Sequence, residues 1–390
     1  MKILFHSLTL LSVLCFMSGC QKKSPKTAGS SSPSFWYLLT GTYTGTGFTY
    51  QGADSGIYIL RMNTSTGELS LVNSSPAIEN PSFLVFDSIR SQVFSVNENE
   101  NGSISSFILD TISMTLRFLN TISSEGKYPC YISLDASGKF VLTANYGSGN
   151  VAAFPIHSDG KVGKATSIHQ HMGNGPIADR QEGPHAHMIL PSPDGKFIYS
   201  TDLGTDELYV YTLDTEKGSL IASGFTIKTS SGAGPRHIAF HNVKPWGYVV
   251  NELNGTIESY LYDEKSGNLN RFQIVSTRLQ NDDRFAGCAD IHIHPSGLFL
   301  YATNRGDINE IVLFEIDQHT GKLSHRANYS SGGKTPRNFS ISPDGKFLLC
   351  AHQNTNNIVV FRIEQATGKL SPTEETISIP APVCLRFIPI

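Results

Sequence analysis

The sequence predicts an all-β fold, a seven-bladed β-propeller whose N- and C-terminal segments share one blade. A unit recurs at a spacing of about 50 residues, which is typical of propeller blades rather than of helical repeats. Turn-forming dipeptides stand at matching places in each unit, and no helix-length periodic segment follows the N-terminal region. Short strands joined by tight turns therefore account for the whole predicted domain.

Residues 1–19 have the pattern of a bacterial lipoprotein signal peptide. An apolar stretch too short for a comfortable membrane span ends at Met17-Ser18-Gly19-Cys20, which resembles a lipobox. Residues 20–34 are polar and rich in Ser and Lys, as expected of a flexible tether. We predict that a lipid on Cys20 anchors the protein to the periplasmic face of the envelope. The outer membrane is weakly favoured, since Lys22 and Lys23 offer no acidic retention signal. The alternative is a cleaved signal with an incidental Cys.

The composition is that of a globular protein, with 39% hydrophobic residues and a formal net charge of -3 over 390 residues. This near-neutral charge argues against nucleic acid as a partner and against a broad membrane-binding face. Beyond the N-terminal region the cysteines form no CxxC pair, which excludes zinc-ribbon and thioredoxin-like sites. We expect them to be small hydrophobes within strands, with a disulfide left open: Cys130, Cys288, Cys350 and Cys384. We expect a monomer without a cofactor.

Each repeat unit begins with a short apolar strand that usually starts at a proline. The starting segments are Pro81-Ser82-Phe83, Pro129-Cys130-Tyr131, Gly183-Pro184-His185, Pro235-Arg236-His237, Cys288-Ala289-Asp290, Pro336-Arg337-Asn338 and Pro382-Val383-Cys384. Turns such as Ser192-Pro193-Asp194-Gly195 and Thr320-Gly321-Lys322-Leu323 follow, because Asp-Gly and Thr-Gly favour hairpins. The pattern gives four strands in a unit, which is the content of a propeller blade.

Both ends of the predicted propeller are incomplete units. Residues 36–71 contain the later strands of a unit without its first strand, and residues 381–390 contain a first strand alone. Joined, they form one blade beside six internal blades, and closing the ring in this way removes exposed sheet edges. We therefore predict a single propeller domain over residues 35–390.

Two columns of residues are predicted to meet at one mouth of the central channel. The first column follows the initiating proline: Ser82, Cys130, Arg236, Ala289, Arg337 and Val383, with His185 or His187 from the longer third unit. The second column ends the next strand: Asn97-Glu98, Asn145-Tyr146, Asp202-Leu203, Asn251-Glu252, Asn304-Arg305 and His352-Gln353. Because neighbouring strands are antiparallel, the start of one strand and the end of the next lie at the same end of the blade.

Three arginines, Arg236, Arg305 and Arg337, are thus expected at one opening together with Glu98 and Glu252. An excess of arginine indicates an anionic ligand, because the guanidinium fork matches carboxylate or phosphate. Structural explanations stay open for other members of the columns. The Asn and Asp residues can cap turns, and Glu252 can form an ion pair with Arg236 or Arg305.

Histidines at i and i+2 lie on one face of a strand and could ligate a metal, as in His185/His187 or His292/His294. However, His294 aligns with Ser192 directly before a turn, so we expect it to be exposed. We predict no metal site.

At several of these segments the chain resembles the seven-bladed lactonase family, which includes propeller-type 6-phosphogluconolactonases and the fungal carboxymuconate cyclase. The matching stretches are Asn145-Tyr146-Gly147, Arg180 to His187, Gly234-Pro235-Arg236-His237, Asn251-Glu252-Leu253, Ile291-His292-Ile293, Tyr301 to Gly306 and Pro336-Arg337-Asn338-Phe339. The resemblance implies a cleft with one His, two Arg and one Glu. By position these catalytic residues are His185 or His187, Arg236, Glu252 and Arg305. We expect Arg337, Asn251, Asn304 and Glu98 to bind substrate.

The expected function is hydrolysis of a small anionic or sugar lactone. Glu252 or the His would act as general base on water, and two arginines would stabilise the developing oxyanion. No Gly-x-Ser-x-Gly elbow lies between a strand and a helix, which argues against a serine hydrolase. A lactonising cycloisomerase and a non-catalytic ligand- or protein-binding propeller remain alternatives. A signal peptide would direct the protein out of the cytosol, where sugar phosphates occur. Either the lipobox interpretation is wrong or the substrate differs from a sugar phosphate, and we favour an unphosphorylated or cell-wall-derived lactone.

Overall fold

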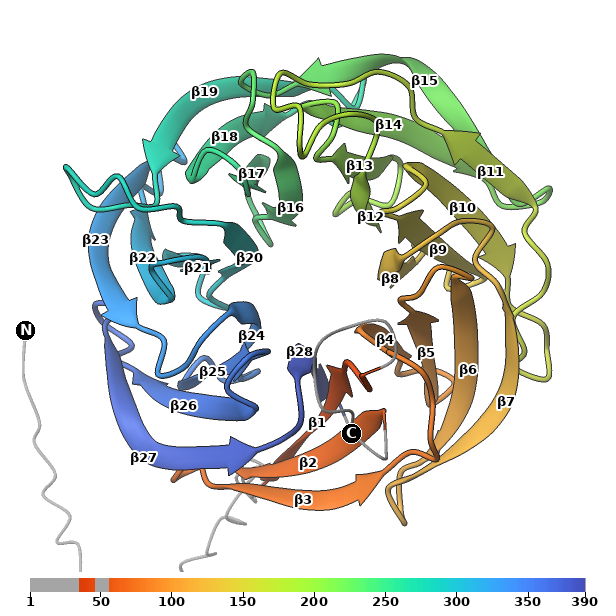
Figure 1. The fold of residues 1–390 in the computed structure, drawn as a ribbon, viewed down its shortest axis with the longest axis horizontal. Coiled ribbons are helices and arrows are strands. Elements are labelled where there is room, and N and C mark those ends of the chain that lie inside the picture. The colour runs from red at the N-terminus through yellow and green to blue at the C-terminus, as the bar shows by residue number, and fades with distance from the viewer. Residues whose placement is uncertain (1–34, 46–55, 390) are drawn as a thin grey trace, which may run out of the picture. The chain divides into compact units, whose positions relative to one another are not determined.

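The computed structural model describes residues 35–45 and 56–389, which form seven four-stranded antiparallel sheets arranged in a ring around a central axis (Figure 1). The predicted signal peptide, the lipid on Cys20 and the tether lie outside the described residues. Among the residues described, no segment is a helix, and so none is a helix long and apolar enough to cross a membrane. The all-β, seven-bladed prediction is confirmed.

Each blade runs from an innermost strand at the channel to an outermost strand at the rim. The closing blade contains, in that order, β28 (Pro382–Ile388), β1 (Phe35–Thr42), β2 (Ile57–Asn63) and β3 (Leu69–Ser74). The next three contain β4 (Phe83–Asp87), β5 (Gln92–Asn97), β6 (Ser103–Asp110) and β7 (Thr115–Ser123); β8 (Pro129–Leu134), β9 (Phe140–Asn145), β10 (Asn150–Pro155) and β11 (Ser167–Gln170); and β12 (Ala186–Pro191), β13 (Ile198–Asp202), β14 (Glu207–Asp214) and β15 (Ser219–Lys228). The last three contain β16 (Pro235–Phe240), β17 (Trp246–Asn251), β18 (Thr256–Tyr262) and β19 (Leu269–Ser276); β20 (Cys288–Ile293), β21 (Phe299–Asn304), β22 (Glu310–Ile316) and β23 (Leu323–Ser330); and β24 (Pro336–Ile341), β25 (Phe347–His352), β26 (Asn357–Ile363) and β27 (Leu370–Ser378).

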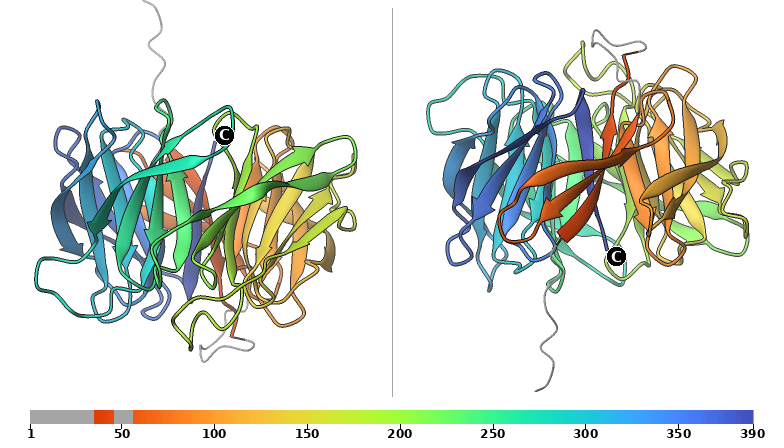
Figure 2. Two further views of the ribbon diagram at one scale, coloured as in Figure 1. Left: turned by 90° about the horizontal axis from the view of Figure 1, so that it is seen from above. Right: turned by 90° about the horizontal axis from the view of Figure 1, so that it is seen from below.

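The ring closes where the sequence predicts, because β28 pairs with β1 over Tyr37↔Ile388 to Gly41↔Cys384. Seen from its edge, the ring shows loops at both mouths of the channel (Figure 2). The second strands, such as β9 and β17, are buried along their whole length because neighbouring blades cover both of their faces. The outermost strands alternate, as in β27, because only one face packs on the core.

The Thr-Gly turn is also a contact between blades. The hydroxyl of Tyr248 on β17 donates to the carbonyl of Gly321 in the following blade, 2.8 Å away. A Cβ at Gly321 would lie 2.6 Å from the ring of Trp246, and its φ of +72° suits glycine. Tyr199 and Tyr301 donate in the same way to Gly267 and Gly368. This turn, with Thr or Ser before the glycine, therefore fastens three successive blades, each to the blade that follows it.

Replacing Gly321 by alanine should lower the free energy of unfolding, because the new methyl group meets Trp246 in addition to straining the turn. Gly224 is a matched control: its φ is +80° but a Cβ there would meet nothing within 4 Å. We expect Gly321→Ala to cost about 1–3 kcal/mol more than Gly224→Ala, the range for overpacking a filled site. Denaturant unfolding of both variants measures the difference, and equal losses would contradict the contact.

Candidate active site

A β-bulge at one end of the innermost strands turns the first predicted column into the channel. The register shifts around Cys130, His187, Arg236 and Arg337, each of which is the extra residue of its strand. A bulge re-aims a side chain, and bulges are frequent beside active sites. The register also decides between the two histidines, because His187, not His185, occupies the bulge position.

The second predicted column lies at the same mouth, as the antiparallel pairing requires. Together the columns line a cavity of about 270 Å³ formed by Tyr43, Glu98, Cys130, Tyr146, Arg180, His187, Arg236, Glu252, Arg305, Arg337 and Gln353. Four guanidinium groups face two carboxylates there, so two positive charges are in excess. The cavity is just below the usual size range of small-molecule sites and suits an anion or a group that becomes negative.

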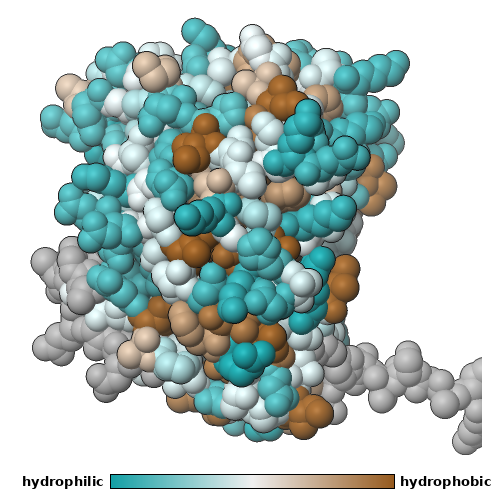
Figure 3. All heavy atoms as spheres, turned by 90° about the vertical axis from the view of Figure 1, so that its right-hand side faces the viewer, coloured by the Kyte–Doolittle hydropathy of each residue, from teal (hydrophilic) through white to brown (hydrophobic). Residues whose placement is uncertain are grey.

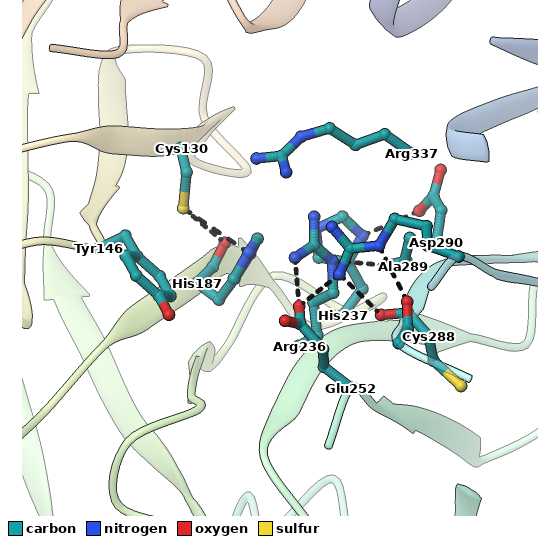
Figure 4. A network of polar contacts seen from close by, with 12 residues as sticks. Cys130, Tyr146, His187, Arg236, His237, Glu252, Cys288, Ala289, Asp290 and Arg337 are labelled. Atoms are coloured by element: carbon teal, nitrogen blue, oxygen red, sulfur yellow. Dashed lines mark hydrogen bonds and ion pairs between the residues drawn. The ribbon is translucent and has the colours of Figure 1, made fainter. Parts of the chain in front are cut away.

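Glu252 is the centre of the charge network (Figure 4). Its Oε2 contacts Nη1 of Arg236 at 2.6 Å and Nη2 of Arg305 at 2.8 Å, and its Oε1 accepts from Nη2 of Arg180 at 2.6 Å. Burial raises the pKa of Glu252, but the three guanidinium groups outweigh it and hold that pKa well below the usual value. A carboxylate so strongly paired is a poor general base, so Glu252 positions the arginines.

The two central arginines are fixed in a way that leaves donors available. Arg236 donates from Nε to the carbonyl of Ala289, and Arg305 donates from Nε to the carbonyl of Gly287. Each also binds Glu252 through one terminal nitrogen, and the other terminal nitrogen has no partner among the described residues. Burial lowers the pKa of Arg305 to about 10, so it still carries its charge at neutral pH.

His187 supplies the uncharged basic group of the cavity. Its side chain is buried, and its pKa is held well below the usual value first by burial and then by the charge of Arg236. A neutral imidazole at pH 7 can accept a proton. The neighbouring thiol of Cys130 lies 3.7 Å from Nδ1 of His187, and burial raises its pKa, so it stays protonated and is not a nucleophile.

Arg337 lies across the cavity from this network (Figure 4). Its Nη2 is 3.7 Å from Oε1 of Glu98, a loose ion pair, while Oε2 of Glu98 accepts the hydroxyl of Tyr43 at 2.9 Å. The guanidinium also stands 5.5 Å from the centre of the Tyr43 ring. Arg337 is therefore the arginine least committed to protein partners in the cavity.

Two lining residues, Arg180 and Tyr43, were not predicted from the sequence. Arg180 lies in the loop between β11 and β12, where Gln181 fixes the loop by donating to the carbonyl of Leu203 and to Asp206. A Cβ at Gly204 would lie 1.8 Å from the carbonyl oxygen of Gly183, so this close approach requires glycine. Arg180 stood within a stretch that carried the family resemblance. Tyr43 directly follows β1, so extending the second column to the closing blade would have found it.

Three predicted site residues, His185, Asn251 and Asn304, are not among the residues that line this cavity. His185 stacks on Tyr146 and contacts that residue's carbonyl oxygen through Nδ1 at 3.0 Å. Asn251 and Asn304 are fully buried. Asn251 donates to the hydroxyl of Thr256 in its own blade, and Asn304 donates to the carbonyl of Thr277, which follows β19 of the preceding blade. Both amides are engaged by protein groups, Asn251 across its own turn and Asn304 between two blades.

The expectation that His294 is exposed is wrong. Its side chain is buried, with Nδ1 against Ser296 and Nε2 2.9 Å from the carbonyl oxygen of Gly345 in the next blade. His292, the other histidine of this predicted pair, contacts Oδ2 of Asp290 through Nε2 at 2.9 Å. The cysteines Cys130, Cys288, Cys350 and Cys384 are buried as free thiols.

Comparison with known proteins is consistent with this arrangement. A family model described as a seven-bladed β-propeller lactonase matches residues 37–387. The 6-phosphogluconolactonase of Bacillus subtilis (strain 168) is 35% identical over 351 residues, which cover 89% of this chain and 97% of that protein. The 6-phosphogluconolactonase of Formosa agariphila is 33% identical over 315 residues, 79% of this chain and 88% of that protein. The structure of the periplasmic gluconolactonase PpgL of Pseudomonas aeruginosa matches with a TM-score of 0.86 and 30% identity, covering 92% of this chain and 100% of that chain.

Proposed function

The chain belongs to the seven-bladed β-propeller lactonase family, and we propose that its cavity hydrolyses the ring ester of an unphosphorylated sugar lactone. The lactonase activity follows from the family and from relatives named 6-phosphogluconolactonase over most of the chain. The observation that carries the proposal is a neutral, buried histidine facing arginines that are fixed by one carboxylate. This combination provides a base for water and donors for an oxyanion.

His187 is the general base. It takes a proton from a water molecule as the water oxygen bonds to the lactone carbonyl carbon, and it returns that proton to the ring oxygen when the C–O bond breaks. Arg236 and Arg305 donate to the carbonyl oxygen, which becomes negative in the tetrahedral intermediate. Their geometry is set before substrate arrives, because Glu252 and two backbone carbonyls hold them. Arg337 binds the carboxylate of the product.

The choice of an unphosphorylated lactone rests on location. The lipobox-like segment at Cys20 supports export and a lipid anchor in the envelope, away from cytosolic sugar phosphates. A structural neighbour whose name describes a periplasmic gluconolactonase supports the same substrate class. On the side of the ring drawn in Figure 3, hydrophobic residues form small groups interrupted by hydrophilic ones. That side offers no broad apolar patch of the kind expected for a protein-binding scaffold.

Substrate choice is tested by measuring kcat/KM on glucono-1,5-lactone and on its 6-phosphorylated form under the same conditions. We expect the plain lactone to have the higher kcat/KM. A preference for the phosphorylated form would contradict the proposed substrate while leaving the lactonase activity in place. Absence of turnover on both, with folded protein, would contradict the proposed function itself.

The pH dependence of kcat/KM should follow His187. Its pKa is lowered from the usual value of 6.5 by burial and by Arg236, so it is already neutral at pH 6.5 and above. We expect kcat/KM to be flat between about pH 6.5 and 8 and to fall only at lower pH, as His187 becomes protonated. A profile that declines steadily from pH 8 to 6 would show that a group with an ordinary histidine pKa is the base.

A further inference from the structure

A second buried imidazole, His237, lies beneath the active-site cavity. It neighbours Arg236 on β16, and its ring centre is 5.4 Å from that of His187 on β12. Its Nδ1 is 2.8 Å from Oδ1 of Asp290 on β20. Its side chain is almost fully buried, yet Nε2 has no hydrogen-bond partner among the described residues. A buried polar atom without a partner calls for an explanation, because such atoms are costly.

A small chamber lies between the two histidines. Its volume is about 10 Å³, which is close to the minimum for one water molecule. Its lining residues are Ser82, Phe83, Glu98, Cys130, His187, Arg236, His237, Arg337 and Val383. Five of them also line the active-site cavity, so the chamber is its floor. A water molecule there would have polar partners on both sides.

His237 also borders a second cavity, of about 510 Å³, formed by the far ends of the innermost strands. Phe240 at the end of β16 and Pro191 at the end of β12 line this cavity, whereas the active site lies where those strands begin. His237 thus stands between the active-site floor and the opposite mouth of the channel.

Asp290 prepares His237 to bind a proton. It accepts hydrogen bonds from His237, His292 and Asn338, and the histidine contacts outweigh burial to hold its pKa well below the usual value. An ionised carboxylate only accepts, so the hydrogen of neutral His237 is on Nδ1 and its lone pair is on Nε2. The same carboxylate stabilises His237 when it becomes charged.

The groups that face His237 favour transient protonation. Arg236 on its own strand and His292 on β20 disfavour a positive charge on His237, whereas Asp290 on β20 favours it. The rings of Tyr131 on β8 and Phe83 on β4 pack edge-on against the imidazole. Burial lowers the pKa of His237 to about 4, so a proton it receives is passed on rather than kept. His187 lacks a carboxylate of its own, because the nearby Glu252 is bound to three arginines.

Hydrolysis of a neutral lactone yields a carboxylate and one proton, and that proton must leave a cavity rich in arginine. We propose that His237 is a proton-relay residue. After His187 has returned its first proton to the ring oxygen, it takes the remaining proton of the carboxylic acid product and passes a proton through one water in the chamber to Nε2 of His237. The Nδ1 proton of His237 then moves to Asp290, which lines the second cavity, and from there to water at the opposite mouth. In the transfer, the water accepts the His187 proton and gives one of its own to Nε2 of His237, so the water is unchanged. The relay rests on the proposed lactonase function.

The test replaces His237 by glutamine, whose amide can still donate to Asp290 but cannot carry a proton. We expect kcat on glucono-1,5-lactone to fall about 10-fold with KM little changed, a smaller loss than the roughly 10²–10⁴-fold of a direct general base. Added imidazole, a small proton carrier, should restore kcat in the variant and leave the parent unaffected. A residue with only a structural function would not respond to imidazole.

His292→Gln is the matched control, because His292 binds the same carboxylate but does not line the chamber. It should behave as the parent does. If His237→Gln does not fold, Asp290→Asn replaces it. An amide at position 290 can donate to Nδ1 of His237, so that neutral His237 carries its hydrogen on Nε2 and cannot accept a proton there. This variant should show the same loss of kcat and the same rescue by imidazole. The relay is overturned if kcat is unchanged, or if it falls without rescue by imidazole. An inactive parent would overturn the proposed function, whereas an active parent with unaffected variants would overturn the relay alone.

Discussion

Replacing His187 by glutamine should lower kcat on a sugar lactone by roughly 10²–10⁴-fold, the usual contribution of a general base. In the proposed reaction His187 is the general base, because burial lowers its pKa and it lines the cavity, while three guanidinium groups hold the pKa of Glu252 well below its usual value. Glutamine keeps a polar side chain of similar reach but accepts no proton. Steady-state kinetics on glucono-1,5-lactone, with thermal unfolding to confirm the fold, measures the effect.

His185→Gln is the control for that experiment. His185 is two residues away and also contacts Tyr146, but it lies outside the cavity lining. Its replacement should leave kcat close to that of the parent. If the two variants exchanged their effects, His185 would be the base and the bulge register would not decide which histidine acts.

Glu252→Gln should have the second large effect, on stability and on activity together. Three guanidinium groups converge on this carboxylate, and a neutral amide would leave their charges uncompensated in a buried place. Removing one partner of a buried ion pair costs about 3–5 kcal/mol. Activity should also fall, because Arg236 and Arg305 would lose the group that aims them. Urea unfolding and kcat/KM measure the two losses.

The exposed pair of Glu315 and Arg326 offers a matched control for stability. Both side chains are about half exposed, so Glu315→Gln should change the free energy of unfolding by less than about 1 kcal/mol. If Glu252→Gln were equally mild, the buried network would contribute little to the fold and the arginines would keep their places without the carboxylate.

The sequence predicted the blades and much of the site because both depend on a repeated register. Once strands are antiparallel and a unit repeats, the residue after the first proline and the residue after the second strand must meet, as Arg236 and Glu252 do. Arg180 could not be placed this way, because a loop outside the repeat carries it. The conformation of that loop depends on the contacts of Gln181 and on close backbone approach at Gly204.

The error at His294 has a simple physical cause. The alignment with Ser192 and Ser342 before the turn is correct, but that position points inward. Ser192 and Ser342 accept backbone N–H groups across their turns, and His294 accepts from Ser296 in the same way while its far nitrogen reaches the next blade. A polar residue before a turn can thus be buried because it caps the turn.

Lactone hydrolysis at this cavity is tested most directly by measuring acid release from glucono-1,5-lactone by pH-stat titration. The parent protein and Arg236→Ala are compared. The parent should release acid faster than the spontaneous reaction, in proportion to its concentration. Arg236→Ala should lose about 10²–10³-fold in kcat, as expected when one oxyanion donor is removed. Acid release at the spontaneous rate by the parent, or equal rates for parent and variant, would contradict lactone hydrolysis at this cavity.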